Sequence, residues 1–305
     1  MNHEKVLIAG GSGLIGKHLS SYLLNKGFEV RVLSRNTRLC TENKNFYLWD
    51  PARKYIDLDA LKDLNIVINL AGAGIADKRW SSERKNVLLE SRIQSLECLK
   101  VNLTEQNIEP IMISASAIGI YGDRGQEELD ENSDPGTGFL SELTSEWEQK
   151  AHEFHDVARK LVIIRIGIVL STQGGALPKL RSTSGVGLYN YFGDGSAYYS
   201  WIHIDDLCEI FYQGIVNPSV NGIINGVAPN PVTNKTLIKT LKNVDRGFGI
   251  ITPVPEIALK TMLGEMSCIV LDSTKVMPRG LLKSDYRFSF PDLESALKDI
   301  LERKI

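Results

Sequence analysis

A run of glycines near the N-terminus constrains the fold of this chain more than any other feature. Residues 5–16 read KVLIAGGSGLIG: an apolar strand pattern leads into Gly10, Gly13 and Gly16, and a helical pattern follows over Leu14–Lys26. Glycines at this spacing let the backbone turn tightly and approach a pyrophosphate, whose charge is met by the N–H groups at the helix N-terminus. Because the run lies between a predicted strand and a predicted helix, it indicates a dinucleotide-binding loop rather than a Gly-rich turn without a ligand.

The N-terminal half of the chain repeats this strand-helix unit. Short apolar runs alternate with amphipathic helical patterns, and strands are predicted at residues 6–9, 30–33, 46–49, 66–70, 111–114 and 161–168. Strands that alternate with helices form a parallel sheet covered on both faces. The sequence therefore predicts an α/β fold, a Rossmann-like doubly wound parallel sheet, over residues 1–172.

The alternation ends after about residue 171. Residues 174–195 are rich in Gly and aromatic side chains and predict a long functional loop. A helix at 204–216 and a strand at 222–227 are expected to bring residues 200–228 back to the main sheet. A turn-rich tail with helical patterns at 233–241 and 293–301 follows. We therefore expect residues 173–305 to form a smaller C-terminal lobe that contacts a substrate or a partner.

Charge and cysteine usage limit the partners of the chain. Its 305 residues include 35 basic and 37 acidic side chains, for a formal net charge of −2, which gives no electrostatic basis for binding nucleic acid or a membrane surface. The four cysteines are widely spaced, as is typical of reduced thiols, and no apolar run reaches the roughly 18–20 residues of a membrane-spanning helix. The first strand pattern starts almost at the first residue, so no signal peptide is predicted. We expect a cytoplasmic monomer or homodimer that acts on a small molecule.

The end of the second predicted strand indicates which nicotinamide cofactor is bound. NAD sites commonly place an acidic residue at this point to accept a hydrogen bond from the ribose 2′-hydroxyl, whereas an Arg accommodates a 2′-phosphate. Here the strand ends in Ser34 and Arg35. The hydroxyl can donate to a phosphate and the guanidinium can pair with it, so NADP(H) is favoured over NAD. The alternative is that Arg35 is an ordinary solvated surface residue.

A set of short segments resembles a known family. The spacing Gly-x-x-Gly-x-x-Gly resembles that of the extended short-chain dehydrogenase/reductase superfamily. The other segments are NLAGAGI (69–75), Arg79-Trp80, ESRI (90–93), SASAIGIYG (114–122), GFLSELTSEWE (138–148), RIGIVLS (165–171), SWIHIDDL (200–207), NGVAPNPVTN (225–234), MPRGLL (277–282) and FSFPDLESAL (288–297). As a set they are similar to the atypical, epimerase-like family with an additional C-terminal domain of unknown function. Its members are described as NADP-binding oxidoreductase-like or sugar-nucleotide-epimerase-like proteins, and some are linked to cell division.

The resemblance implies a set of cofactor contacts along the chain. Arg92 stands on the long helix where extended members usually have Asn, so its guanidinium is expected to reach the cofactor ribose or pyrophosphate. Val169 falls where backbone groups usually meet the nicotinamide amide. The full set is Gly10, Gly13, Leu14, Ile15, Gly16, Ser34, Arg35, Leu70, Ala71, Gly72, Arg92, Ser114 and Val169.

The resemblance also implies catalytic chemistry that this sequence supplies only in part. In the superfamily a Ser or Thr after the fifth strand holds the substrate oxygen, and a Tyr transfers the proton while a Lys four residues later lowers the pKa of the Tyr. The Ser position matches Ser116, or Ser114 in a register shifted by two. At the expected helix start the Tyr position holds Phe139 or Leu140, and the Lys position holds Leu143 or Thr144. These side chains include no Tyr and no Lys, so the usual acid–base route is in doubt.

Several other side chains are candidates to replace this Tyr/Lys pair. The spacing Tyr22-x-x-x-Lys26 reproduces it, but it lies on the first helix, where Tyr22 is expected to pack and Lys26 to complement the helix C-terminus. Tyr121 is the candidate proton donor, against the alternative that it packs. His203 and Asp205 could reach the cleft, although a helix cap at Asp205 or Asp206 is favoured. The pair His152 and His155 has the spacing of metal ligands on a helix but lacks a third ligand. The aromatic residues Tyr189, Tyr191, Phe192, Tyr198, Tyr199 and Trp201 are expected either to line a substrate pocket or to fill the seam between lobes.

Two hypotheses follow. In the first, the chain is an NADP(H)-dependent oxidoreductase or epimerase-like enzyme that holds a carbonyl, hydroxyl or nucleotide-sugar-like substrate with Ser116 and protonates it from Tyr121 or water. In the second, it is a non-catalytic NADPH-binding protein that acts through a protein partner. The retained Ser and the aromatic residues favour the enzyme, whereas the missing Tyr/Lys pair favours the binding protein.

Overall fold

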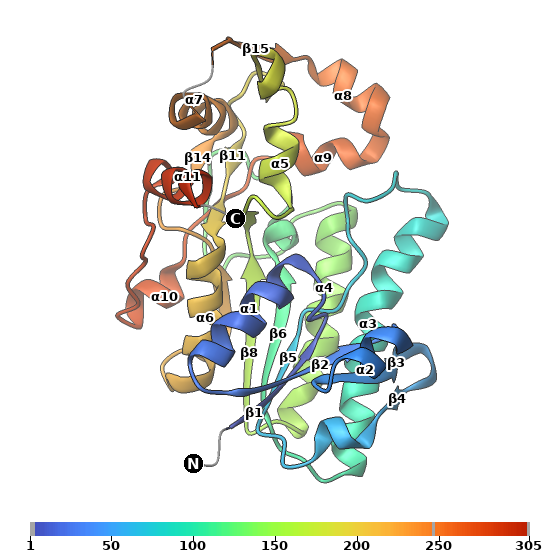
Figure 1. Ribbon diagram of the computed structural model, residues 1–305. Coiled ribbons are helices and arrows are strands. Elements are labelled where there is room, and N and C mark those ends of the chain that lie inside the picture. The colour runs from blue at the N-terminus through green and yellow to red at the C-terminus, as the bar shows by residue number, and fades with distance from the viewer. Residues whose placement is uncertain (1–3, 246–247, 304–305) are drawn as a thin grey trace.

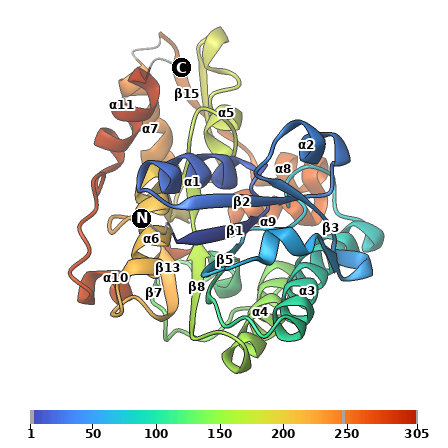
Figure 2. The ribbon, with the colours of Figure 1, turned by 60° about the horizontal axis from the view of Figure 1, so that its bottom comes forward.

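The central sheet of the protein confirms the predicted α/β class. The computed structural model describes residues 4–245 and 248–303 and has one large sheet under a smaller lobe (Figures 1 and 2). Within the described residues this sheet has eight strands in the order β13-β8-β6-β5-β1-β2-β3-β4, parallel except for β4. The strands are β1 (Lys5–Ala9), β2 (Glu29–Ser34), β3 (Phe46–Asp50), β4 (Tyr55–Ile56), β5 (Ile66–Asn69), β6 (Ile111–Ala117), β8 (Lys160–Ile166) and β13 (Gly222–Gly226).

Helices cover both faces of this sheet, because successive strand residues point to opposite sides. Val6 and Ile8 of β1 lie in one apolar core, and Leu7 and Ala9 lie in the other. Helices α1 (Leu14–Asn25) and α6 (Ile204–Val216) pack on each other on the first face, and α3 (Ser82–Glu105) and α4 (Phe139–His152) pack on each other on the second (Figure 2). The short helix α2 (Thr37–Glu42) lies beside β2 and β3. The near-continuous apolar strands of the sequence are explained by this burial on both faces.

The sixth predicted strand is two strands rather than one. β8 ends at Ile166, and β9 (Ile168–Leu170) leaves the sheet to pair with β12 (Trp201–His203). Gly167 lies at the break, and a Cβ atom there would be 2.6 Å from the carbonyl oxygen of Ser200. This close approach of two backbones lets β9 turn towards the upper lobe.

The expected loop at 174–195 is instead structured. It contains α5 (Ala176–Leu180) and β10 (Leu188–Phe192), which pairs in parallel with β15 (Ile250–Val254). The prediction failed because strand pairing between distant segments leaves no local sequence signal. The other elements of the upper part are β11 (Tyr198–Tyr199), β14 (Val232–Thr233), α7 (Asn234–Asp245), α8 (Glu256–Leu263), α9 (Cys268–Leu271), α10 (Arg279–Lys283) and α11 (Leu293–Glu302), with the pair β7 (Glu128–Leu129) and β16 (Lys275–Val276).

The upper lobe lies over the carboxyl ends of the sheet strands (Figure 1). The strand expected at 222–227 is β13, and it joins the edge of the main sheet next to β8. The domain limits at 172/173 and 200–228 stay predictions, and the outermost residues of the two predicted domains, 1–3 and 304–305, lie outside the described residues. In open α/β sheets, ligands bind outside the carboxyl ends of the strands, which here is the space between sheet and lobe.

Candidate functional site

The glycine loop leaves the start of α1 open. Gly10 has φ of 83°, and a Cβ atom on it would lie 2.7 Å from the backbone of Leu70. A Cβ atom on Gly16 would lie 2.4 Å from the carbonyl oxygen of Gly10. Gly13 is the N-cap and has no side chain to bond the first N–H groups of α1, which also has no acidic residue in its first turn. The loop is therefore closely packed on itself and presents unshielded N–H groups, the arrangement that suits a pyrophosphate.

A cavity of about 410 Å³ lies directly against this loop. It is lined by Gly10, Gly13, Leu14, Ile15, Gly16, Leu70, Ile168, Val169, Gly175 and Ala176. Seven of the predicted cofactor residues therefore share one cavity. Its backbone-rich, largely apolar wall fits a dinucleotide, which is held at its phosphates by N–H groups and elsewhere by packing.

The end of β2 carries the side chains expected at the 2′ position of the cofactor. Ser34 is buried, and its hydroxyl accepts a hydrogen bond from the N–H of Asn36 at 3.1 Å. Arg35 is exposed, and within residues 4–245 and 248–303 it forms no ion pair. The next cation, Arg38, is paired with Glu42 at 2.6 Å. The guanidinium of Arg35 is thus available to a phosphate.

The loop after β5 is supported from behind by Arg92. The guanidinium, only 6% exposed, donates from Nη1 to the Leu88 carbonyl at 2.7 Å and from Nη2 to the Ala73 carbonyl at 3.2 Å. It also lies over the Trp147 ring, 4.9 Å from the centroid, and a Cβ atom on Gly72 would be 3.0 Å from it. Burial lowers the pKa of Arg92 to about 10. Its two terminal nitrogens are used by protein carbonyls, so this arrangement supports the loop and leaves the expected direct contact with a cofactor as a prediction only.

A second cavity is lined by two of the residues that the sequence places at the positions of the usual catalytic pair. It has a volume of about 260 Å³, and its wall includes Ala117, Gly119, Leu140 and Thr144. Leu140 and Thr144 are one turn apart on α4, and the Thr144 hydroxyl donates back to the Leu140 carbonyl at 2.7 Å. Of the alternatives left open by the sequence, Phe139 and Leu143 do not line the cavity, whereas Leu140 and Thr144 do. Leu140 has no ionisable group, and Thr144 has a hydroxyl that is already bonded to its own helix.

The predicted catalytic residues Ser116 and Tyr121 do not line this cavity. The Ser116 hydroxyl donates to Glu148 on α4, while the neighbouring Ala117 faces the cavity, because side chains alternate along β6. Ser114, expected as the alternative, is fully buried and bonds the carbonyl of Ala115. The predicted assignment of Ser116 as the group that holds the substrate oxygen therefore lacks support from its position, and the same alternation could have been read from the sequence.

Tyr121 is part of a buried network behind the cavity. Its side chain is fully buried, and its hydroxyl donates to the side chain of Asn225 at 2.8 Å and accepts from Arg165 at 2.9 Å. Arg165 in turn makes a two-pronged ion pair with Glu148, with both N···O distances 2.8 Å. Burial raises the pKa of Tyr121 to about 12, opposite to what a proton donor near neutral pH needs. This placement argues against Tyr121 as the acid and for a structural role.

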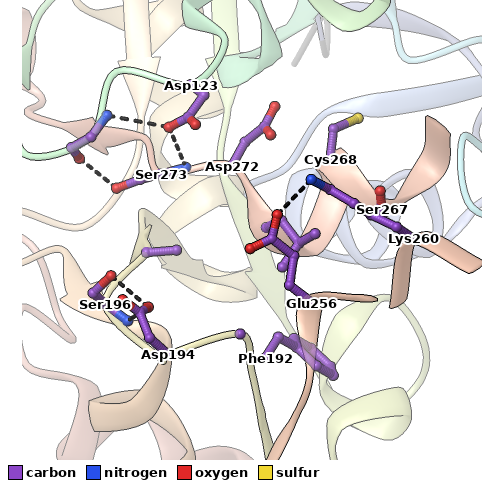
Figure 3. Close-up of a pocket in the computed structure, with 14 residues that line it drawn as sticks. Asp123, Phe192, Asp194, Ser196, Glu256, Lys260, Ser267, Cys268, Asp272 and Ser273 are labelled. Atoms are coloured by element: carbon purple, nitrogen blue, oxygen red, sulfur yellow. Dashed lines mark hydrogen bonds and ion pairs between the residues drawn. The ribbon is translucent and has the colours of Figure 1, made fainter. Parts of the chain in front are cut away.

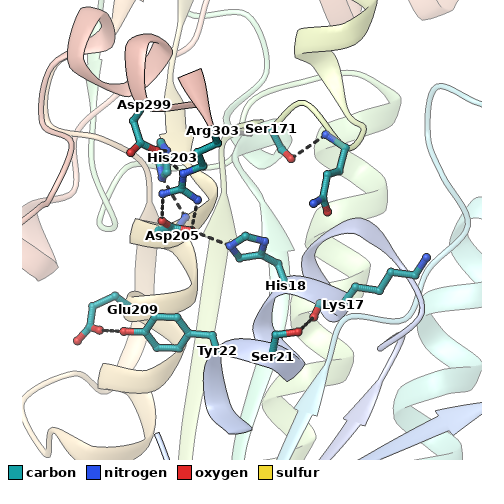
Figure 4. A network of polar contacts seen from close by, with 11 residues as sticks. Lys17, His18, Ser21, Tyr22, Ser171, His203, Asp205, Glu209, Asp299 and Arg303 are labelled. Atoms are coloured by element: carbon teal, nitrogen blue, oxygen red, sulfur yellow. Dashed lines mark hydrogen bonds and ion pairs between the residues drawn. The ribbon is translucent and has the colours of Figure 1, made fainter. Parts of the chain in front are cut away.

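Tyr22 and Lys26 belong to a different network, where α1 packs on α6 (Figure 4 shows Tyr22 with its partner Glu209). The Tyr22 hydroxyl donates to Glu209 of α6, and Lys26 lies 3.7 Å from the same carboxylate. One turn away, His18 contacts Asp205 at 2.6 Å. The pair is therefore a packing contact between α1 and α6: Tyr22 bonds α6 rather than packing under the sheet, and the role expected of Lys26 at the helix C-terminus stays a prediction.

His203 and Asp205 tie this helix pair to the C-terminal helix. His203, not Asp205 or Asp206, caps α6: its Nδ1 accepts from the Asp205 N–H at 3.1 Å, and its Nε2 lies 3.1 Å from Asp299 of α11. Arg303 pairs with both Asp205 and Asp299. Burial lowers the pKa of His203 to about 4. Three ligand-type atoms of His203, Asp205 and Asp299 lie within 4.8 Å of one another, but the Arg303 cation is bonded to both carboxylates.

The remaining candidates separate into surface, core and cavity. The rings of His152 and His155 stack at the surface with centroids 5.6 Å apart, and Nδ1 of His152 lies 3.4 Å from Nε2 of His155. Trp201 is fully buried in the core and Tyr189 nearly so. Phe192 and Tyr199 line an apolar cavity of about 580 Å³, and Tyr199 and Tyr198 line the smaller one. These aromatic residues are therefore divided between the core and the walls of cavities, and a role in binding substrate stays a prediction.

Four residues of the C-terminal lobe complete the wall of the 260 Å³ cavity and were not predicted from the sequence. Cys268, Ile269, Asp272 and Thr274 line the same space as Leu140 and Thr144, although more than 120 positions separate them. They lie in and just after α9 of the C-terminal lobe and carry no recognisable motif. Within the described residues, no helix is both long and apolar enough to cross a membrane.

Comparison with known proteins agrees with this geometry. The model of the NAD dependent epimerase/dehydratase family matches residues 6–225, and a domain of unknown function (DUF1731) matches residues 254–300. An epimerase family protein of Staphylococcus saprophyticus is 34% identical over 97% of this chain and 98% of its own. The crystal structure of human epimerase family protein SDR39U1 (isoform 2) with NADPH is 29% identical, with a TM-score of 0.86 over 98% of this chain and 100% of that one. A nucleoside-diphosphate sugar epimerase from Corynebacterium glutamicum is 31% identical, with a TM-score of 0.78 over 98% of this chain and 58% of that one.

The family match extends over the glycine loop, the sheet and the strand that returns to it, and the second match covers the segment that closes the cavity. The first match agrees with binding of a nicotinamide cofactor. The chain therefore belongs to the NAD dependent epimerase/dehydratase family, with the additional C-terminal domain DUF1731.

Proposed function

We propose that this protein binds NADP(H) and uses it to oxidise or reduce a small carbonyl or hydroxyl compound in the cavity between sheet and lobe. The observation that carries the proposal is the pairing of an open glycine loop with an unpaired Arg35 at the end of β2. A guanidinium at that point matches a 2′-phosphate dianion, whereas NAD would be better matched by a carboxylate. The human relative with NADPH supports the same choice.

The cavity lining supports a small, partly apolar substrate over a nucleotide sugar. Ile75, Ile168, Leu180, Leu263 and Met266 form much of the 580 Å³ cavity, and Lys179 is its only lining cation among the described residues. A nucleotide sugar brings two phosphates, which are usually met by more than one cation or helix N-terminus. When bound, a reduced nicotinamide supplies a hydride; the chain supplies the walls, which orient the substrate and keep water out.

The second candidate function is non-catalytic NADPH binding coupled to a protein partner. The replacement of the usual pair by Leu140 and Thr144 favours it. Under either candidate we propose a monomer or homodimer that works in the cytoplasm and binds neither nucleic acid nor membranes.

The cofactor assignment is tested by Arg35→Ala. Loss of the guanidinium–phosphate pair is expected to weaken NADPH binding about 10- to 100-fold and NADH binding less than twofold, as measured by nicotinamide fluorescence titration. Arg38→Ala is the matched control, because Arg38 is a neighbouring cation already paired with Glu42. Equal losses for NADPH and NADH in the Arg35 variant would refute the 2′-phosphate assignment.

A further inference from the structure

One carboxyl group of the C-terminal lobe reaches the cavity that holds the replaced catalytic pair. Asp272 follows α9 and lines the 260 Å³ cavity together with Leu140 and Thr144. It also lines an adjoining cleft of about 570 Å³, which contains Asp123 and Cys268 (Figure 3). The carboxyl therefore stands between the cavity and a route to solvent.

Hydrogen bonds of the two residues that follow Asp272 hold this part of the backbone in place. Ser273 accepts a hydrogen bond from the Tyr198 N–H at 2.9 Å and donates to the Gly125 carbonyl, and Thr274 donates to the Gly122 carbonyl at 3.3 Å. In the part of the chain that the structure describes, no side chain or N–H group bonds the Asp272 carboxylate. A positioned carboxyl with unused oxygens is suited to exchange a proton with a ligand.

The surroundings of Asp272 favour its neutral form. Burial, and then the charge of Asp123, raise the pKa of Asp272 to about 6. Asp123 itself accepts hydrogen bonds from the Ser273 N–H at 3.1 Å and the Gly125 N–H at 3.3 Å. The thiol of Cys268 faces the same space, and burial raises its pKa to about 12, so it stays neutral.

The cations near Asp272 are already paired. Across the cleft, Lys260 pairs with Glu256 at 2.5 Å. On the other side Lys275 pairs with Glu128 at 2.9 Å and lies over the Tyr198 ring. Among the described residues that line these two spaces, no unpaired cation is therefore left to hold Asp272 in its charged form.

We infer that Asp272 is the acid–base group of this site, supplied by the C-terminal lobe in place of the missing Tyr/Lys pair. The inference rests on the proposed function. In the reducing direction, the carbonyl carbon would gain the hydride released from a C–H bond of the reduced nicotinamide, which is thereby oxidised, and the C=O π pair moves to oxygen. That oxygen takes the proton of Asp272: an O–H bond forms on the substrate as the carboxyl O–H bond breaks. The carboxylate regains a proton from water through the cleft, and the oxidation of an alcohol uses the same group as a base.

The test is a carboxyl titration by ¹³C NMR of the full chain with labelled Asp, saturated with NADPH or with NADP⁺. Asp272→Asn assigns the signal. If the nicotinamide end of the cofactor shares this cavity with Asp272, the cationic ring of NADP⁺ lowers the pKa of Asp272 by about half a pH unit or more relative to NADPH. Asp194 is the control, because it lines only the outer cleft and bonds Ser196; its pKa should be the same in both states.

A kinetic comparison completes the test. With hexanal, benzaldehyde and 2,3-butanedione as probes, NADPH oxidation by the wild type should slow as pH rises above about 6, and Asp272→Asn should lose this slope and at least about 30-fold in rate. Asp272→Glu should restore the slope. An equal rate and slope in the Asn variant would overturn the inference.

The NMR result decides even if none of these probes is turned over. A pKa of Asp272 that is identical with NADPH and NADP⁺ overturns the inference while leaving cofactor binding intact. Absence of binding of either cofactor to the wild type refutes the proposed function itself, and the inference falls with it.

Discussion

The space between sheet and lobe contains two cavities that are built in different ways, one at the glycine loop and one at the far end. At the glycine end, residues 10–16 form a contiguous segment whose backbone is the binding surface. At the far end, Ala117, Leu140, Thr144 and Asp272 come from β6, α4 and the C-terminal lobe, and their side chains form the wall. Under the proposed function, cofactor binding depends on local backbone geometry, whereas proton transfer depends on one side chain that any element around the cavity can supply.

This difference explains how the family fold can be kept while the usual catalytic pair is lost. Backbone N–H groups at a helix start cannot be moved to another element, so the glycine spacing must persist where a pyrophosphate is bound. A carboxyl or phenol needs only to reach the reacting atom, so its place in the sequence is free. The predictions below test whether the two ends are separable in this way.

The largest effect is expected behind the far end, at Glu148→Ala. Glu148 is buried and forms a two-pronged ion pair with Arg165, which itself is only 5% exposed. The substitution leaves a buried guanidinium without its carboxylate, and we expect the free energy of unfolding to fall by about 3–5 kcal/mol. Urea unfolding measures the loss.

A surface ion pair is the control for this loss. Asp59 and Lys62 are 2.6 Å apart and exposed. Asp59→Ala should leave the free energy of unfolding nearly unchanged, because solvent screens an exposed ion pair. Similar losses of unfolding free energy in the two variants would show that the Glu148–Arg165 pair does not stabilise the structure behind the cavity.

At the glycine end, Gly16→Ala should abolish tight cofactor binding. The new methyl group would approach the Gly10 carbonyl oxygen to 2.4 Å, so loop and helix must separate and the N–H groups lose their geometry. We expect binding of NADPH to weaken about 100-fold, which corresponds to about 2.8 kcal/mol, in a fluorescence titration. Gly185→Ala is the matched control, since a Cβ atom there meets no atom within 4 Å. Unchanged binding in the Gly16 variant would disprove the role of the loop.

Acidification should destabilise the contacts of His203 that join α6 to the C-terminal helix, rather than the contacts at the far end. The folded-state pKa of His203, about 4, lies below the ordinary value of 6.5, so the unfolded chain binds the proton more readily between these values. Stability from neutral His203 is therefore present above pH 6.5 and is lost as pH falls towards 4, by about 2 kcal/mol. Protonation of Nδ1 would also remove the acceptor for the Asp205 N–H.

The variant His203→Asn isolates this contribution, because Asn can cap a helix but does not titrate. The raised pKa of Asp272 acts with the opposite sign between about pH 4 and 6, where it adds stability on acidification. The wild type minus the Asn variant cancels the Asp272 contribution. A difference in unfolding free energy that is flat with pH from 4 to 6.5 would contradict the assignment.

The predicted glycines line one cavity together, whereas the predicted Ser116 and Tyr121 do not line the other, for a physical reason. Gly10, Gly13 and Gly16 act through the backbone of one turn, and the alternation of strands with helices needs only local periodicity. The roles expected of Ser116 and Tyr121 came from a motif, but β6 turns Ser116 towards Glu148 and Tyr121 towards Asn225. Asp272 was not considered, because its place opposite Leu140 depends on how the C-terminal lobe packs on the sheet.

The smallest effect, and the one that separates structure from chemistry most sharply, is expected for Tyr121→Phe. Loss of the hydroxyl leaves Asn225 without a donor and removes one acceptor from Arg165, which should lower the free energy of unfolding by about 1–2 kcal/mol. The hydroxyl does not line the cavity, so NADPH binding should change less than twofold and any turnover should keep its pH profile. Asp272→Asn should show the reverse pattern: stability near neutral pH is kept or raised, because a charge that burial disfavours is removed, while the pH profile is altered. A Tyr121 variant with full stability and no turnover would return the proton-donor role to Tyr121 and remove it from the C-terminal lobe.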